Sequence, residues 1–210
     1  MYQPKDVITS IDQVYANQRQ PYDSQTQKFI DHIDDLCRAW IEHSTFLTMA
    51  TVDRAGNMDV SPKGDPAGFV KILDPKTLAI PDRPGNHRYD GFQNIMETGR
   101  VGLVFLVPNR NEVVRVNGSA VVVEDMAVRE ICAIKGRVPD FAVIVHVEEA
   151  FYHCGKSIIR SRLWHPDQQR PVEGLPSYAE ALMAHGELTE DIEDLAARLK
   201  HNDEKRLYDE

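Results

Sequence analysis

Arginine, lysine and amide side chains gather in a few short segments of this sequence, and the densest is LAIPDRPGNHRYDG. It carries Arg83 and Arg88, and the planar guanidinium of arginine grips a phosphate with parallel N–H donors. Asn86 is a typical N-cap, and the helix expected after it would offer free backbone N–H groups to an anion. The segment indicates a phosphate pocket built from Arg83, Asn86, Arg88 and helix amides. A solvated loop whose arginines pair with Asp82 and Asp90 explains the local sequence equally well.

Two strand-like segments add polar groups to this picture. VSPKGDPAGFV places Ser61, Lys63, Gly64 and Asp65 at the end of an expected strand, next to a loop. Lys63 would supply a further positive charge if two neighbouring hairpins pair. In VVRVN, Arg115 and Asn117 alternate with valines and so share one face of a strand. They would line a polar pocket or face solvent.

The segment CGKSIIRSRLW forms a third group. On a helix, Lys156, Arg160 and Trp164 would stack in one basic and aromatic stripe. The alternative is a surface helix with a half-buried tryptophan.

Several familiar motifs are absent or incomplete. GKS at 155–157 lacks the glycine of a phosphate loop, because position 150 is Ala150. There is no GxSxG and no GxGxxG. His146 and His153 fall on opposite faces of a strand, and their spacing matches no common zinc signature. We therefore expect one buried and one exposed histidine, and no metal site.

Composition limits the class of protein. The 210 residues carry 24 basic and 33 acidic side chains, a net charge of −9, so partners such as nucleic acid or an anionic membrane are not expected. The three cysteines show no CxxC spacing, which is typical of free thiols in a reducing cytoplasm. No signal peptide is evident, and no apolar run approaches the ~20 residues that cross a bilayer. A soluble, cytoplasmic protein is expected.

Strand patterns dominate the middle of the chain. FLTMATVD and MDVSP flank a turn, as do GFVKILD and TLAIPD, and both pairs predict hairpins. RVGLVFLV predicts a strand buried on both faces, EVVRVNGSAVVVE a strand with a bulge at Gly118, and FAVIVHVEEAFYHC a long strand. Helices are expected at about 87–98, 125–135 and 154–164. This order favours a mainly β, α+β fold with an antiparallel barrel.

The ends of the chain differ from the middle. Residues 1–24 are predicted to form an arm, and an amphipathic helix is expected from Gln25 to Ile41 with Asp23 or Ser24 as its N-cap. We assign 25–166 to the barrel domain. Residues 167–210 are expected to hold a Pro-rich linker and a charged helix at about 189–201.

Taken together, these segments resemble the pyridoxamine 5′-phosphate oxidase-like, FMN-binding split-barrel superfamily, and most closely its bacterial branch of FMN-dependent proteins. The likeness runs from about Ile8 to Pro166 and rests on FLTMATVDRAGNMDVSPKGDPAGFV, LAIPDRPGNHRYDGFQNIMETGRVGLVFLVP, RVNGSA and HCGKSIIRSRLW. It implies a six-stranded split barrel with peripheral helices that forms a homodimer and binds FMN at the subunit interface. The implied cofactor-binding residues are Ser61, Lys63, Gly64, Pro81, Asp82, Arg83, Asn86, Arg88, Arg115, Arg160 and Trp164.

The resemblance implies roles as well as contacts. Ser61 and Lys63 would run alongside the flavin, Arg83 and its loop would hold the ring edge and phosphate, and Trp164 would reach the flavin from the partner subunit. Lys63 or Arg115 is predicted to stabilise negative charge on the reduced flavin. DVSPKG and GNHR depart from the motifs of the vitamin B6 oxidases, so pyridoxamine phosphate is unsupported as the substrate.

The function this implies is an FMN-dependent oxidoreductase acting on a small molecule or electron donor, with no assignable catalytic residue. Two alternatives remain open. One is a flavin-binding storage or sensor protein without turnover, and the other is a split-barrel reductase that uses a deazaflavin.

Overall fold

Seven strands form one antiparallel sheet in the computed structural model, which describes residues 1–209. Their order is β2-β1-β5-β6-β7-β4-β3. The resemblance implied six strands, whereas each of the seven strand-like segments in the sequence forms one. The additional strand is the short edge strand β3, which pairs only with β4. The bounds are β1 (Phe46–Val52), β2 (Met58–Gly64), β3 (Lys71–Asp74), β4 (Thr77–Pro81), β5 (Arg100–Leu106), β6 (Val113–Val123) and β7 (Ala142–His153).

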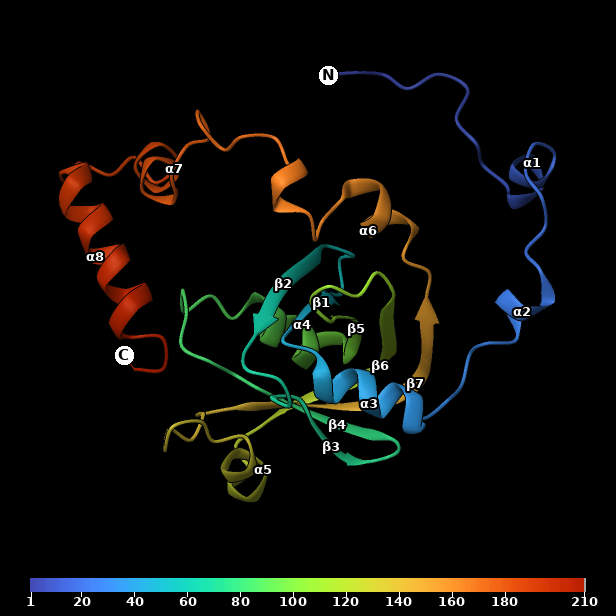
Figure 1. The fold of residues 1–210 in the computed structure, drawn as a ribbon, viewed down its shortest axis with the longest axis horizontal. Helices are drawn as coiled ribbons and strands as arrows, with labels where there is room; N and C mark the ends of the chain where they lie inside the picture. The colour runs from blue at the N-terminus through green and yellow to red at the C-terminus, as the bar shows by residue number, and fades with distance from the viewer. Residues whose placement is uncertain (210) are drawn as a thin grey trace.

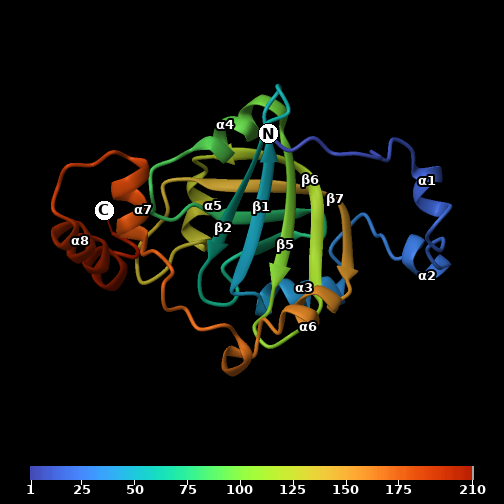
Figure 2. The ribbon, with the colours of Figure 1, turned by 90° about the horizontal axis from the view of Figure 1, so that it is seen from above.

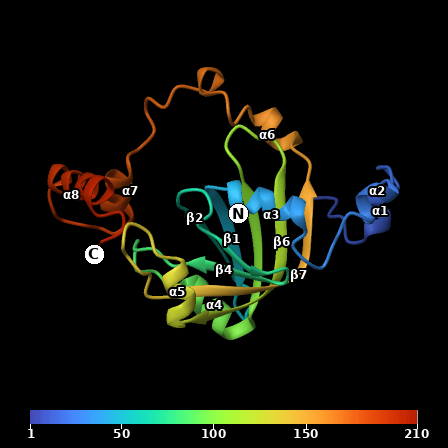
Figure 3. The ribbon, with the colours of Figure 1, turned by 60° about the horizontal axis from the view of Figure 1, so that its bottom comes forward.

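The sheet curls because its two longest strands, β6 and β7, connect its two halves. The first half of β6 pairs with β5, and the first half of β7 pairs with β4. Figures 2 and 3 show the two halves running in different directions around the interior. The β6–β7 register shifts between Asn117 and Gly118, which confirms the predicted bulge. The result is a split-barrel-like fold.

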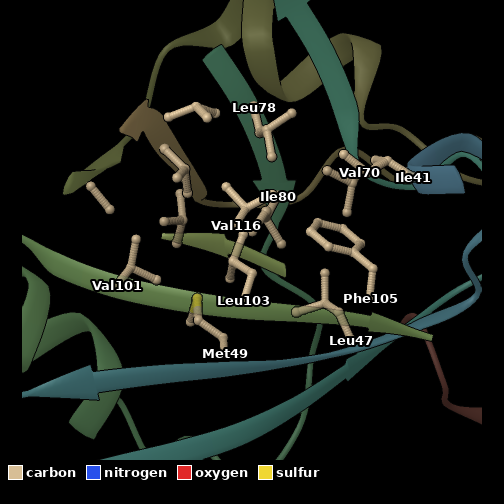
Figure 4. Close-up of a cluster of buried hydrophobic side chains, with 14 of the residues drawn as sticks. Ile41, Leu47, Met49, Val70, Leu78, Ile80, Val101, Leu103, Phe105 and Val116 are labelled. Carbon is tan, nitrogen blue, oxygen red and sulfur yellow. The ribbon is translucent and has the colours of Figure 1, made fainter. Parts of the chain in front are cut away.

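Large aliphatic and aromatic side chains fill the interior between the halves (Figure 4). Phe105, Leu47, Leu78 and Val116 are fully buried there. The prediction that β5 is buried on both faces was wrong, because alternate residues of β5 are buried and the others are at most partly covered. One face of β5 therefore lines the core and the other lies on the outside of the sheet.

Helix α3 (Asp35–His43) packs on β6 and β7. It is shorter than the predicted helix from Gln25, and its N-cap is Asp34, whose carboxylate accepts a hydrogen bond from the Cys37 N–H at 2.8 Å. Neither predicted N-cap is correct: α2 (Asp23–Thr26) is a separate short helix. Ile30 instead bridges to Ala150 of β7 through two backbone hydrogen bonds of 3.0 and 2.7 Å. A non-local backbone pairing replaces the helix there.

Three short helices lie within the ranges where helices were expected. They are α4 (Asp90–Thr98), α5 (Met126–Ile131) and α6 (Lys156–Ser161). Gly99 ends α4 in the left-handed conformation, with φ 67°, as predicted. The N-cap of α4 is Tyr89 and not Asn86, so the helix begins later than the sequence indicated.

The terminal segments lie on opposite sides of the sheet (Figure 1). On one side are α1 (Ile11–Tyr15) and α2; on the other are α7 (Tyr178–His185) and α8 (Ile192–Lys205), which follow the one-turn η1 (Pro166–Gln168). α8 matches the predicted charged helix, but α7 was not predicted. Its signal is a capping box, in which Ser177 and Glu180 each accept a backbone hydrogen bond from the other. Among residues 1–209, no helix has the length and apolar character that a bilayer span requires.

The three cysteines are free thiols in different surroundings. Cys37 and Cys132 are buried, and burial raises the pKa of both, that of Cys37 to about 12. Cys154 is exposed. Because the thiolate is the reactive form, we expect one thiol per chain to react rapidly with Ellman's reagent in the native protein, and all three after unfolding. Rapid reaction of Cys37 without unfolding would contradict the packing of α3.

Candidate functional site

A cavity of about 1090 Å³ opens between β2 and the loop that follows β4. Residues 81–92 form one wall, residues 137–141 a second, and the end of the chain at Tyr208 and Asp209 a third. Phe69 and Phe92 contribute apolar surface. Eight predicted site residues lie in this one cavity: Ser61, Lys63, Gly64, Pro81, Asp82, Arg83, Asn86 and Arg88.

The wall formed by β2 presents two donors, a hydroxyl and an ammonium. Ser61 pairs with Met49 and Lys63 with Leu47 across the β1–β2 ladder, so both side chains share the face of β1 that packs on the core. The hydroxyl of Ser61 is buried and has no hydrogen-bond partner. Within residues 1–209, Lys63 forms no ion pair. A buried hydroxyl without a partner is costly, so the Ser61 hydroxyl calls for an acceptor inside the cavity.

Arg83 is held by a buried ion pair. Its Nε lies 2.7 Å from Oδ2 of Asp65, and a terminal nitrogen donates to the backbone carbonyl of Cys132 at 2.8 Å. The side chain of Asp65 is 1% exposed and that of Arg83 is 17% exposed. The solvated-loop interpretation was wrong for this arginine, because its partner comes from the end of β2 and the pair is shielded from water.

Arg88 fits the solvated-loop interpretation better. Its Nε lies 2.8 Å from Oδ2 of Asp90, and its side chain is 73% exposed. The backbone N–H of Arg88 donates to the side-chain oxygen of Asn86 at 3.0 Å. Asn86 therefore shapes the loop and does not cap α4. The Arg88 guanidinium stands at the rim of the cavity with a weakly held partner.

The end of the chain completes the cavity, which the sequence did not indicate. The hydroxyl of Tyr208 donates to Oδ1 of Asp65 at 2.6 Å, and this bond raises the pKa of the phenol. Its ring lies 5.9 Å from the guanidinium carbon of Arg83. Asp209 forms an ion pair with Arg137 at 2.7 Å. No sequence motif marks Tyr208, which lies 143 residues from Asp65.

Arg115 lies on the other face of the sheet. It stands opposite Val104 and Phe151 in the ladders, and its guanidinium carbon lies 5.0 Å from the centre of the Phe151 ring. Asn117 lies on the same face and donates to the Glu149 carboxylate at 2.7 Å. Arg115 therefore does not line the cavity of its own chain.

Arg160 and Trp164 also lie away from the cavity. The predicted stripe with Lys156 does not form, because α6 ends at Ser161 and Arg162 takes the left-handed conformation with φ 52°. The indole N–H of Trp164 donates to the carbonyl of Arg110 at 2.7 Å. Arg160 is exposed on α6.

His146 and His153 are both exposed on β7, so the expectation of one buried and one exposed histidine was wrong. The strand carries the extra residue Glu148 at the bulge, which changes the alternation between the two histidines. In the described part of the chain, no three histidine, cysteine or carboxylate side chains are grouped to hold a metal ion.

Comparison with known proteins identifies the family to which this chain belongs. The family model for pyridoxamine 5′-phosphate oxidase matches residues 33–154. The chain belongs to the pyridoxamine 5′-phosphate oxidase family. The match spans every strand of the sheet and the β2 and loop walls of the cavity. It is a family of split-barrel proteins that bind flavin-type cofactors.

Solved structures similar to this family member share low sequence identity with it. HupZ from Group A Streptococcus is 22% identical, with a TM-score of 0.48, over 57% of this chain and 93% of that one. A candidate pyridoxamine 5′-phosphate oxidase from Lactobacillus delbrueckii is 28% identical, with a TM-score of 0.46, over 58% of this chain and 95% of that one. An FMN-binding protein from Syntrophomonas wolfei is 13% identical, with a TM-score of 0.41, over 55% and 86%. No curated protein sequence matches this chain.

Proposed function

We propose that this protein is an FMN-dependent oxidoreductase that holds the flavin by its phosphate in the cavity between β2 and the loop after β4. The observation that carries the proposal is the buried hydroxyl of Ser61, which has no hydrogen-bond partner and lines the cavity beside Lys63. Both stand in a cavity of about 1090 Å³, which is large enough for a flavin nucleotide. The donor set therefore fits a cofactor that carries negative charge and carbonyl oxygens.

We assign phosphate binding to Arg88 and the loop around Asn86. The Arg88–Asp90 pair is exposed to water, and such pairs contribute little stability. Arg88 can therefore leave Asp90 for a phosphate at small cost. Arg83 has a different role, because its guanidinium already donates hydrogen bonds to Asp65 and to the carbonyl of Cys132. It positions the loop.

When bound, FMN supplies the hydride and electron transfer, and the protein supplies position and electrostatics. Ser61 would donate to a flavin oxygen or nitrogen. Lys63 would place a positive charge beside the ring and favour the reduced, negatively charged form. Of the two cations expected in that role, Lys63 lines the cavity, whereas Arg115 lies on the opposite face of the sheet.

Replacing Lys63 with methionine is expected to lower the midpoint potential of the bound flavin. Loss of the ammonium removes a charge that favours the reduced form, and a tenfold change in that balance corresponds to about 30 mV for a two-electron couple. Equilibration with reference dyes measures the potential. Lys200→Met on α8, where the lysine is 75% exposed, is the matched control. An unchanged potential in Lys63→Met would contradict this role.

Absorption spectra test the function itself. The purified protein is mixed with FMN and passed over a gel-filtration column, and the retained flavin is then reduced with NADH or NADPH. Retained flavin bands that bleach with one of these donors and recover in air are the expected result. Retained FMN that no donor reduces would favour a flavin-binding protein without turnover. A protein that retains no flavin would overturn the proposal.

A homodimer is part of this proposal. Arg115, Arg160 and Trp164 lie away from the cavity of their own chain, so they would contribute to a flavin site only from a second copy. The outer edge of β2 carries Met58 and Val60, which are 65% and 60% exposed. Light scattering coupled to gel filtration should give twice the mass of the 23.8 kDa chain, and the mass of a single chain would contradict the dimer.

A further inference from the structure

The last turn of the chain is built into the cavity wall at several points. Tyr208 donates to the buried carboxylate of Asp65, and its ring lies 5.1 Å from the ammonium of Lys135 and 5.9 Å from the guanidinium of Arg83. Asp209 pairs with Arg137, which lines the same cavity. These contacts connect the chain end to β2, to the loop after β4 and to the segment before β7.

This wall adjoins the loop to which the proposed function assigns the phosphate. Asp65 directly follows the end of β2, and Arg83 lies in the loop that carries Asn86 and Arg88. Any group that extends a ligand beyond its phosphate in this direction meets the ring of Tyr208. It also meets Asp209, whose carboxylate pairs with Arg137. The wall therefore limits the length of what the cavity accepts.

We infer that Tyr208 determines cofactor specificity: the chain end closes the cavity behind the phosphate, so that FMN fits and a flavin extended beyond its phosphate, such as FAD, is excluded. The inference rests on the proposed function, since it concerns the same cavity. Asp65 and Arg83 act on specificity through Tyr208, by holding its hydroxyl and ring in place.

Quenching of flavin fluorescence measures the affinities for FMN and FAD. Four forms of the full-length protein are compared: wild type, Tyr208→Phe, Tyr208→Ala, and Tyr178→Ala as the control. Tyr178 is 62% exposed on α7 and does not line the cavity. Limited trypsin digestion reports the docking of the chain end without any flavin, because Lys205 and Arg206 immediately precede the docked segment.

The wild type is expected to bind FMN at least roughly tenfold more tightly than FAD, and Tyr208→Ala to reduce that ratio by about tenfold through stronger FAD binding. Tyr208→Phe keeps the ring and loses the hydrogen bond, so its ratio should be intermediate. Tyr208→Ala should also be cut faster by trypsin, whereas Tyr178→Ala should match the wild type in both measurements.

Two results would overturn the inference, and they can be told apart. If FMN binds and the ratio stays the same in Tyr208→Ala, the inference fails and the proposed function stands. If no form binds either flavin, both fail together. A chain that ends at Leu207 removes the ring without placing a new side chain in the wall. An unchanged ratio in that chain would overturn the inference even if Tyr208→Ala folds poorly.

Discussion

Replacing Asp65 with alanine is expected to lower the free energy of unfolding by about 3–5 kcal/mol, the cost of removing one partner from a buried ion pair. The side chain of Asp65 is 1% exposed and holds both Arg83 and Tyr208. Without it, the Arg83 guanidinium stays largely buried with no opposing charge, and the phenol loses its acceptor. Urea unfolding followed by tryptophan fluorescence measures the change.

Asp65→Asn and Glu148→Ala are informative comparisons. The asparagine keeps an acceptor for Arg83 and Tyr208 but removes the charge, so its loss should be smaller than that of Asp65→Ala. Glu148 pairs with Arg100 at 2.9 Å in an exposed position, where the pair contributes little. Equal losses from Asp65→Ala and Glu148→Ala would mean that the buried pair has no special role.

Gly118→Ala should destabilise the fold by at least about 3 kcal/mol, because the new methyl group cannot be accommodated at the bulge. A Cβ at this position would lie 2.0 Å from the backbone carbonyl oxygen of His146 and 3.1 Å from its carbonyl carbon. Backbone atoms cannot turn away as a flexible side chain does. The β6–β7 pairing, which joins the two halves of the sheet, would have to open locally.

The same unfolding measurement applies here, with Gly91→Ala as the control. The first turn of α4 holds Gly91, where a Cβ would meet Oδ2 of Asp59 at 3.5 Å, an ordinary contact. Alanine also favours the helix more than glycine, so this variant should be as stable as the wild type or slightly more so. A Gly118→Ala protein with wild-type stability would contradict the register of β6 and β7.

The sheet could be predicted from the sequence because its signals are local. The turns between β1 and β2 and between β3 and β4 lie next to the residues they join, and Gly118 marks its own bulge. The start of α3 could not be predicted. The periodicity around Ile30 is helical, but the backbone of Ile30 pairs with Ala150, and nothing near Ile30 in the sequence reveals that partner.

In the site, too, residues with a local sequence signal could be predicted and contacts between distant segments could not. The sequence placed Lys63 at the end of a strand and Arg88 in the loop before a helix, and both line the cavity. The partner of Arg83 was not predicted: the solvated-loop interpretation offered Asp82 and Asp90, whereas Asp65 becomes its neighbour only when the two hairpins fold against the core. Tyr208 was missed for the same reason: a tyrosine in a charged chain end carries no local sign that it reaches a cavity.

If the cavity holds FMN by its phosphate, the dissociation constants of FMN and riboflavin must differ. The two ligands differ only in the phosphate, so fluorescence titration of the wild type with each isolates the contribution of that group. FMN is expected to bind roughly a hundredfold more tightly than riboflavin, a difference of about 2.7 kcal/mol. Equal affinity for the two ligands, or binding of neither, would contradict it.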